Sequence, residues 1–149
     1  MKILNRKINR EYEVFEKYQA GIVLSGSEVK SVRQGGLRLE NSFIKFLEDG
    51  PYLINAEIPK YRFSGEKNYD PKKSRKILLN KDEILKISTK IKSSRGLTIV
   101  PTSCYNKGVH LKLEIALVRG RKEFQKRKFD KKKEISKRGK REVKEYLRG

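Results

Sequence analysis

The segment VHLKLEIALV, residues 109–118, restricts the fold most, because apolar and polar residues alternate over most of its length. Successive side chains of a β-strand point to opposite faces, so this pattern buries one face and leaves the other in solvent. The residues expected to face inwards are Val109, Leu111, Leu113, Ile115 and Leu117, and those expected to face outwards are His110, Lys112 and Glu114. One buried and one solvated face is typical of an antiparallel sheet.

Two other segments carry strand patterns. Residues 11–24 place apolar residues at even spacing, and Gly21 is an expected bulge or bend. Residues 97–105 predict a strand in which Pro101 marks an edge or a bulge, followed by a tight turn at 106–108.

Residues 42–58 predict a hairpin. Asp49-Gly50-Pro51 is the expected turn, and the returning strand alternates at Tyr52, Ile54, Ala56 and Ile58. Residues 59–76 are polar and basic with two prolines, which predicts a long loop, and such loops are typically functional or disordered.

Two segments carry helix start signals. Ser25 followed by Glu28 matches a capping box, so a short helix is expected to begin there and to stop at Gly35-Gly36. Val29 and Val32 share one face of it, and the charged residues expected to point away from that face are Glu28, Lys30 and Arg33. Asn80 with Glu83 matches a second capping box, and this helix is expected to bury Ile84, Ile87 and Ile91 before Gly96.

These elements predict a mainly β domain over residues 1–118. We expect an OB-like closed antiparallel barrel of about six strands with two or three short helices, because closure removes exposed strand edges. Residues 119–149 form a separate basic tail with 15 Lys/Arg and five Asp/Glu. The tail has too few apolar residues to bury the surface that would offset the entropy lost on ordering the chain. It is therefore expected to be disordered alone and helical on its partner.

The net charge of +20 points to a polyanionic partner, with nucleic acid the first candidate and an anionic membrane surface the second. No apolar run approaches the roughly 20 residues of a membrane span, and the N-terminal residues lack the apolar region of a secretory signal, so a cytoplasmic protein that does not bind membranes is expected. Cys104 is the only cysteine and His110 the only histidine, which excludes an internal disulfide and a multi-cysteine zinc site. No cofactor or metal is expected.

Catalytic groupings are not evident. The chain has no Gly-rich phosphate loop, and its two adjacent carboxylate pairs, Glu48-Asp49 and Asp82-Glu83, fall in an expected turn and an expected first helical turn. A metal-dependent nuclease therefore remains a minor alternative, and the chain is not expected to be an enzyme.

Basic residues gather in three places expected to be exposed: Lys30 and Arg33 on the short helix, residues 72–76 in the long loop, and the tail. Together they favour RNA or DNA binding over a merely solvated surface. The nearby aromatic residues Tyr61, Phe63 and Tyr69 either stack on unpaired bases or pin the loop to the barrel.

The block AGIVLSGSEVKSVR, residues 20–33, resembles the family of small protein B, the bacterial tmRNA-binding proteins of trans-translation. Further segments that resemble this family, in the same order, are DPKKSRKILLN (70–80), KDEI (81–84), GLTIVP (96–101), CYNKGVHLKLEIAL (104–117) and RGRK (119–122). The resemblance implies an OB-like barrel that binds the tRNA-like domain of tmRNA as a monomer in the complex. It also implies that the tail enters the decoding centre of the small ribosomal subunit and the empty mRNA channel, folding there into a helix.

The resemblance also implies site residues. Those expected to bind tmRNA are Asn5, Gln19, Glu28, Lys30, Arg33, Arg75, Lys76 and Ile77, with Glu28 expected to orient its neighbours rather than to touch phosphate. Those expected to bind the ribosome are Arg121, Lys122, Lys126, Arg127, Lys131, Lys132, Lys137, Arg138, Lys140 and Arg141.

Two departures from the family pattern bear on these assignments. The family commonly has glutamate at Gln19, so a hydrogen bond can survive there without charge assistance. The Asp-Lys-Arg step of the family tail matches residues 125–127 by spacing and 130–132 by composition, which leaves two registers open. A general or ribosomal RNA-binding barrel is the alternative function.

Overall fold

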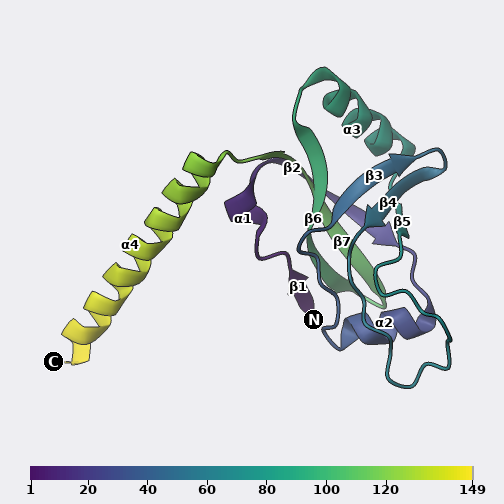
Figure 1. Ribbon diagram of the computed structural model, residues 1–149, viewed down its shortest axis with the longest axis horizontal. Coiled ribbons are helices and arrows are strands. Elements are labelled where there is room, and N and C mark those ends of the chain that lie inside the picture. Colours follow the sequence, from purple (N-terminus) through teal and green to yellow (C-terminus); the bar gives the residue numbers. More distant parts are fainter. Residues whose placement is uncertain (149) are drawn as a thin grey trace.

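The computed structural model describes residues 1–148, with side chains to Arg141, as seven strands and four helices (Figure 1). The strands are β1 (Lys2–Leu4), β2 (Tyr12–Ile22), β3 (Phe43–Leu47), β4 (Gly50–Ile54), β5 (Arg75–Leu78), β6 (Leu97–Lys107) and β7 (His110–Gly120). The helices are α1 (Ile8–Glu11), α2 (Gly26–Arg33), α3 (Lys81–Ser93) and α4 (Glu123–Arg148).

Six of the strands close into a ring. The order is β6-β3-β4-β5-β2-β7, every pair is antiparallel, and β7 pairs back onto β6. β1 is added beside the ring, on β6. The prediction of a mainly β, antiparallel, closed fold is confirmed, and the ring leaves few strand edges free for pairing with other chains.

β7 supplies the core as its alternation predicts, with one exception. Leu111, Leu113, Ile115 and Leu117 are buried inside the ring. Val109 is 79% exposed, so its inward assignment is wrong: it lies in the turn after Gly108, whose φ is +61°, before the strand begins. The opposite face of β7 is also buried at one end, where Ala116 and Val118 pack with Ile8 of α1.

The strand irregularities lie at one expected position and one unexpected one. The register of β6 against β7 shifts between Pro101 and Ser103, which confirms the bulge. In β2 the shift lies between Val14 and Glu16, so a bulge at Gly21 is wrong. Gly21 pairs on both sides of β2, and a Cβ there would lie 3.3 Å from that of Leu78, so this glycine permits close approach of two strands.

The 42–58 hairpin forms with a different phase. Leu47 pairs with Gly50, so the two turn residues are Glu48 and Asp49 rather than Asp49-Gly50-Pro51. Pro51 and Leu53 face the core, whereas Tyr52 and Ile54 are half-buried. Asn55 then takes a left-handed φ of 65°, and the buried positions after it are Ala56 and Ile58.

The predicted helices are present with one difference at a cap. Ser25 and Glu28 form the complete capping box of α2. Asn80 is the N-cap of α3 but makes no side-chain hydrogen bond there, so the second capping box is wrong. Ile87 is fully buried, Ile91 is half-buried against the core, and Ile84 is half-buried.

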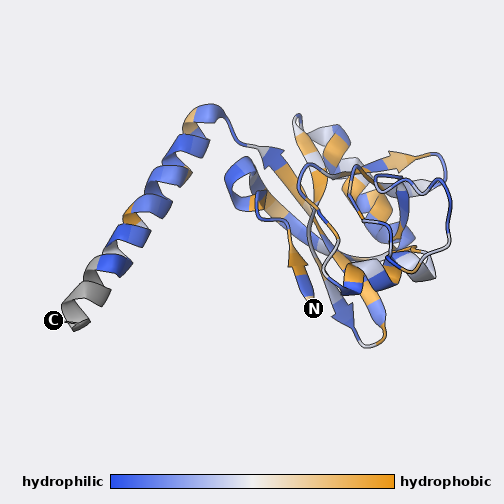
Figure 2. Cartoon of the chain, turned by 60° about the horizontal axis from the view of Figure 1, so that its bottom comes forward, coloured by the Kyte–Doolittle hydropathy of each residue, from blue (hydrophilic) through white to orange (hydrophobic). Residues whose placement is uncertain are grey.

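α4 leaves the barrel as a single helix with a largely hydrophilic surface, whereas the strands concentrate the apolar residues (Figures 1 and 2). The sequence patterns did not predict β1 and α1. β1 pairs with β6 beside the ring, and α1 contacts α4. Over the part of the chain that the structure describes, no helix is both long and apolar enough to cross a membrane.

Candidate RNA-binding surface

Glu28 on α2 lies in a buried network instead of facing solvent. Its side chain is 3% exposed, and its Oε2 accepts a hydrogen bond from Arg75 Nε at 2.9 Å. Its Oε1 accepts one from the Ser25 N–H at 3.1 Å and lies 3.5 Å from Lys73 Nζ. The expectation that Glu28 points away with the other charges of the helix is therefore wrong.

Arg75 extends this network to the loop before β5. Its side chain is 1% exposed, and its guanidinium donates to the Ala56 carbonyl at 2.7 Å and to the Tyr69 hydroxyl at 3.1 Å. The Tyr69 hydroxyl donates in turn to the Ile58 carbonyl at 2.8 Å. Arg75 was expected within an exposed basic cluster, but it instead joins α2, β5 and residues 56–69.

The titration of this network reflects a competition between burial and the partners of Glu28. Burial alone would raise the pKa of Glu28, but the Ser25 N–H and the Arg75 guanidinium outweigh it and hold that pKa below its usual value. Burial, followed by the Glu28 charge, raises the pKa of the Tyr69 hydroxyl. The carboxylate is thus charged at neutral pH, and its pairing with Arg75 fixes the position of α2 on the barrel.

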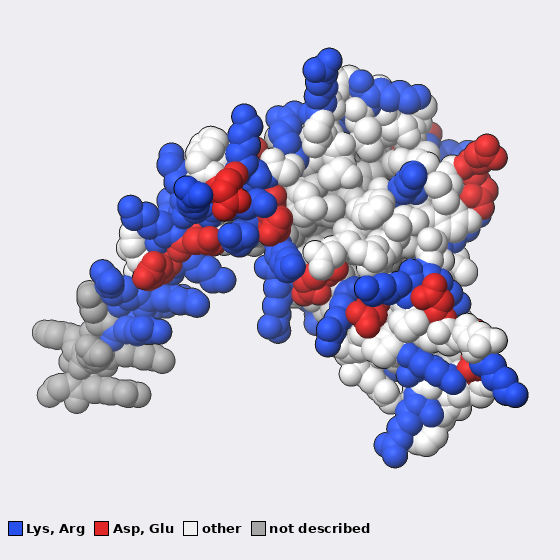
Figure 3. Space-filling model, in the orientation of Figure 1, with Lys and Arg blue, Asp and Glu red and all other residues white. Residues whose placement is uncertain are grey.

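Lys30 and Arg33 are the exposed cations of α2. Lys30 Nζ lies 5.5 Å from the centre of the Tyr61 ring, and Arg33 donates to the Val109 carbonyl at 2.8 Å. These contacts place both cations at the outer surface of the helix. Figure 3 shows Lys and Arg side chains over this lower part of the body and along α4.

Gln19 faces solvent from β2 and lines a hollow of about 330 Å³ with residues of β5 and α3. Leu78 lies in the same hollow and is 55% exposed. Ile77, which was expected at the RNA surface, is 1% exposed and belongs to the core. Since neighbouring strand residues point to opposite faces, alternation through β5 identifies Leu78 and Lys76 as its outward residues.

Asn5 is a buried structural residue. Its side-chain amide donates to the Pro101 carbonyl at 2.9 Å, and its backbone N–H donates to the Thr102 carbonyl at 2.8 Å. Its Oδ1 accepts from the Lys7 N–H at 3.2 Å. These bonds hold the link between β1 and α1 on β6, so a direct contact of Asn5 with RNA would require this arrangement to open.

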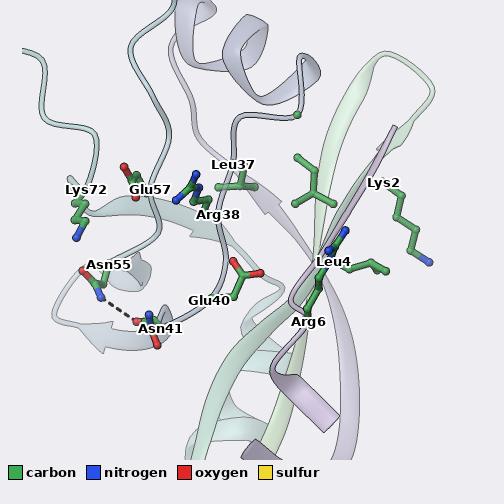
Figure 4. A pocket seen from close by; sticks show the side chains of 12 residues that line it. Lys2, Leu4, Arg6, Leu37, Arg38, Glu40, Asn41, Asn55, Glu57 and Lys72 are labelled. Carbon is green, nitrogen blue, oxygen red and sulfur yellow. Dashed lines mark hydrogen bonds between the residues drawn. The ribbon is translucent and has the colours of Figure 1, made fainter. Parts of the chain in front are cut away.

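A larger hollow, of about 710 Å³, lies between β1 and residues 35–57 (Figure 4). Its cations are Lys2, Arg6, Arg38 and Lys72, and its acids are Glu40 and Glu57. Backbone hydrogen bonds between Arg38 and Glu57 and a bond from Asn55 Nδ2 to the Asn41 carbonyl hold its wall. The excess of cations suits an anionic ligand such as a phosphate.

The two adjacent carboxylate pairs lie where the sequence places them, in the turn of the hairpin and in the first turn of α3. Asp49 accepts a hydrogen bond from the Tyr52 hydroxyl, and Asp82 and Glu83 lie in the first turn of α3. Within the side chains that the structure describes, no group of three or more His, Cys, Asp or Glu residues could hold a metal ion.

The start of α4 is tied to α1 and β2. The Arg10 guanidinium donates to both carboxylate oxygens of Asp130, and Lys126 Nζ lies 3.2 Å from a Glu11 oxygen. Arg121 donates through its N–H to the Glu11 carbonyl at 2.8 Å. Arg121 and Lys126 are thus half-buried against the body. The other cations expected to bind the ribosome are exposed: Lys122, Arg127, Lys131, Lys132, Lys137, Arg138, Lys140 and Arg141.

A family model described as SmpB protein matches residues 2–145. The chain belongs to the SmpB family. SsrA-binding proteins are similar over nearly the whole length: that of Thermosipho melanesiensis is 42% identical over 100% of both chains, and that of Sulfurihydrogenibium sp. is 44% identical over 97% of this chain and 92% of its own.

A solved structure described as "tmRNA-SmpB: a journey to the center of the bacterial ribosome" contains a chain of similar fold. The TM-score is 0.66 at 38% identity, over 82% of this chain and 85% of that chain.

In this SmpB family member, the residues expected to bind tmRNA fall into two structural groups. Gln19, Lys30 and Arg33 are exposed and Lys76 is half-buried, so these side chains are available to a partner. The group buried in the free protein consists of Asn5, Glu28, Arg75 and Ile77. The structure therefore separates side chains that can contact RNA from those that hold the contacting surface in place.

Proposed function

We propose that this protein is the tmRNA-binding adaptor of trans-translation. It binds the tRNA-like domain of tmRNA as a monomer, delivers it to stalled ribosomes and makes or breaks no covalent bond itself. The observation that carries this proposal is the full-length similarity to SsrA-binding proteins, which includes the barrel and the basic tail alike. Since its partner is the ribosome, we place its action in the cytoplasm.

The two parts of the chain divide the work. The barrel, residues 1–118, uses Gln19, Lys30, Arg33 and Lys76 to contact the tRNA-like domain, with the exposed Leu78 beside Gln19 as an apolar contact. Glu28 and Arg75 act as positioning residues, because their side chains are buried against each other. Since Gln19 is neutral, it offers RNA hydroxyls and amines a hydrogen bond without charge assistance.

The tail, residues 119–149, carries the ribosome contacts. Its cations serve the small-subunit RNA of the decoding centre and the mRNA channel. α4 is a helix in this structure, but it has few apolar residues and, over the side chains that the structure describes, is tied to the body only near its start, through Arg10 and Glu11. These features support our proposal that this helix is not stable in the free protein and forms fully on the ribosome. Asp130 faces Arg10 in this structure, so the register that aligns residues 130–132 with the family's Asp-Lys-Arg step requires this ion pair to break on the ribosome.

A competition titration tests the proposal. Labelled tRNA-like domain of tmRNA is bound at physiological salt and displaced by bulk tRNA, with the full chain and with residues 1–120, which retain every strand of the ring. We expect bulk tRNA to displace poorly from either form, and only the full chain to support tagging of stalled peptides. Equal displacement by bulk tRNA would instead favour the alternative, a general or ribosomal RNA-binding barrel.

A further inference from the structure

The loop between β4 and β5 carries three aromatic residues, and the structure gives them two different roles. Tyr69 points inwards, where its hydroxyl bonds to the Ile58 carbonyl and to Arg75, so it pins the loop to the barrel. Tyr61 and Phe63 make no such bond, and Phe63 is 74% exposed. The alternatives of base stacking and loop pinning therefore apply to different residues.

Phe63 is surrounded by groups that suit a stacking partner with negative charge nearby. The Tyr61 ring meets it edge to face, with ring centres 5.7 Å apart and planes at 69°. The Arg62 guanidinium lies 5.4 Å from the centre of the Phe63 ring. Lys30 of α2 lies 5.5 Å from the centre of the Tyr61 ring, so the aromatic pair continues the exposed cationic surface of α2.

This combination favours a nucleobase as the occupant. An exposed aromatic ring contributes binding free energy when a base stacks on it, and every base presents a π-face. Phosphates beside a stacked base would contact the flanking cations. A basic or neutral peptide would leave Arg62 and Lys30 without charged partners. Phe63 has no hydrogen-bonding group, so it can recognise that a base is unpaired without reading its identity.

We propose that Phe63, supported by Tyr61 and Arg62, is a stacking site for an unpaired base of structured RNA. The site deepens the proposed function, because on that function the RNA is tmRNA. It does not depend on selectivity for tmRNA, since stacking on Phe63 would serve any RNA with an accessible base.

The experiment compares full-chain variants by titration against two probes, the tRNA-like domain of tmRNA and bulk tRNA. F63L keeps an apolar side chain but removes the ring, F63Y keeps the ring, and L85A is the matched control because Leu85 is also largely exposed, at 69%, on α3. Stacking predicts roughly tenfold weaker binding for F63L, with F63Y and L85A within about twofold of the parent. Urea unfolding midpoints verify that all variants are folded.

Ultraviolet cross-linking with peptide mapping gives a second readout. The expected result is an RNA-linked peptide that contains Phe63 and is lost in F63L. Unchanged affinity of F63L for both probes would overturn the stacking site, even if the parent protein prefers tmRNA. Equal weakening of F63L toward both probes, with a parent protein that shows no preference, would support the stacking site and refute the proposed function.

Discussion

Removing the Glu28 carboxylate is expected to destabilise the fold rather than to remove a contact with RNA. In Glu28→Ala, the Arg75 guanidinium would stay buried without its carboxylate partner, which typically costs about 3–5 kcal/mol. The Ser25 N–H would also lose its acceptor, a further loss of about 1 kcal/mol for the helix cap. Since a domain is stable by only about 5–15 kcal/mol, this variant should be marginally folded.

The double variant Glu28→Met with Arg75→Met separates the charge effect from packing. It removes both charges together, so its loss of stability should be smaller than the sum of the losses of the two single variants. This holds although the Ala56 carbonyl loses its donor. The assay is urea unfolding followed by tyrosine fluorescence, which suits a chain with seven tyrosines and no tryptophan. A loss below about 1 kcal/mol in Glu28→Ala would refute the reasoning, because that is the scale of an exposed ion pair.

The pH dependence provides an independent check on the same network. The pKa of Glu28 in the folded protein lies below its ordinary value of 4.5. Its ionised form therefore contributes stability above that ordinary value, and the contribution is lost as the pH falls through the lower folded-state pKa. Glu28→Gln should show a weaker loss of stability over this acid range than the parent protein.

Other predictions address the core, a tight turn and the tail. Burial raises the pKa of the Cys104 thiol to about 11. Alkylation of this thiol at pH 8 should therefore be slow in the native protein and fast in urea, and rapid alkylation of the native protein would contradict its burial. A Cβ at Gly36 would lie 3.0 Å from the Ser31 carbonyl oxygen. Gly36→Ala should therefore lower the free energy of unfolding, measured in urea, by about 1–3 kcal/mol, and an unchanged unfolding midpoint would show that the turn can adjust. In a double-mutant cycle on Arg10 and Asp130, either single loss should speed amide exchange in the first turns of α4 about as much as both losses together. Exchange equal to that of the parent protein would mean that this pair does not hold the helix.

Local patterns in the sequence predict five strands of the ring but neither β5, whose first two residues were expected in the long loop, nor what is added to the ring. Alternation over 109–118 reflects one buried face, so it identifies β7 directly. β1 and α1 span three and four residues, too few for either period to be visible, and they are held by long-range pairing with β6 and packing on β7. Val109 shows that a pattern can also extend beyond its strand. The alternation includes this residue, but it lies in the turn before β7, where there is no core for its side chain to contact.

The site shows a similar division. Lys30 and Arg33 could be assigned to solvent from their places on α2, and the structure agrees. Glu28 could not be assigned correctly, because its partner Arg75 lies 47 residues away and only the closed ring brings the two together. Reading β5 by alternation, and not by its cluster of charges, would have placed Arg75 inside and Leu78 outside.

β2 relates the two surfaces that the proposed adaptor needs. Its first residue, Tyr12, pairs with Gly120 at the base of the tail, and its last residue, Ile22, lies just before α2. Eleven residues of extended chain, at a rise of about 3.3 Å per residue, hold the two surfaces about 33 Å apart. Because β2 pairs with β7 from Tyr12 to Gly21 and with β5 at its last two residues, the separation is fixed by the ring and not by a flexible linker. Loss of tail cations should therefore leave the α2 surface intact, whereas opening the ring at the β2–β7 seam should disturb both surfaces together.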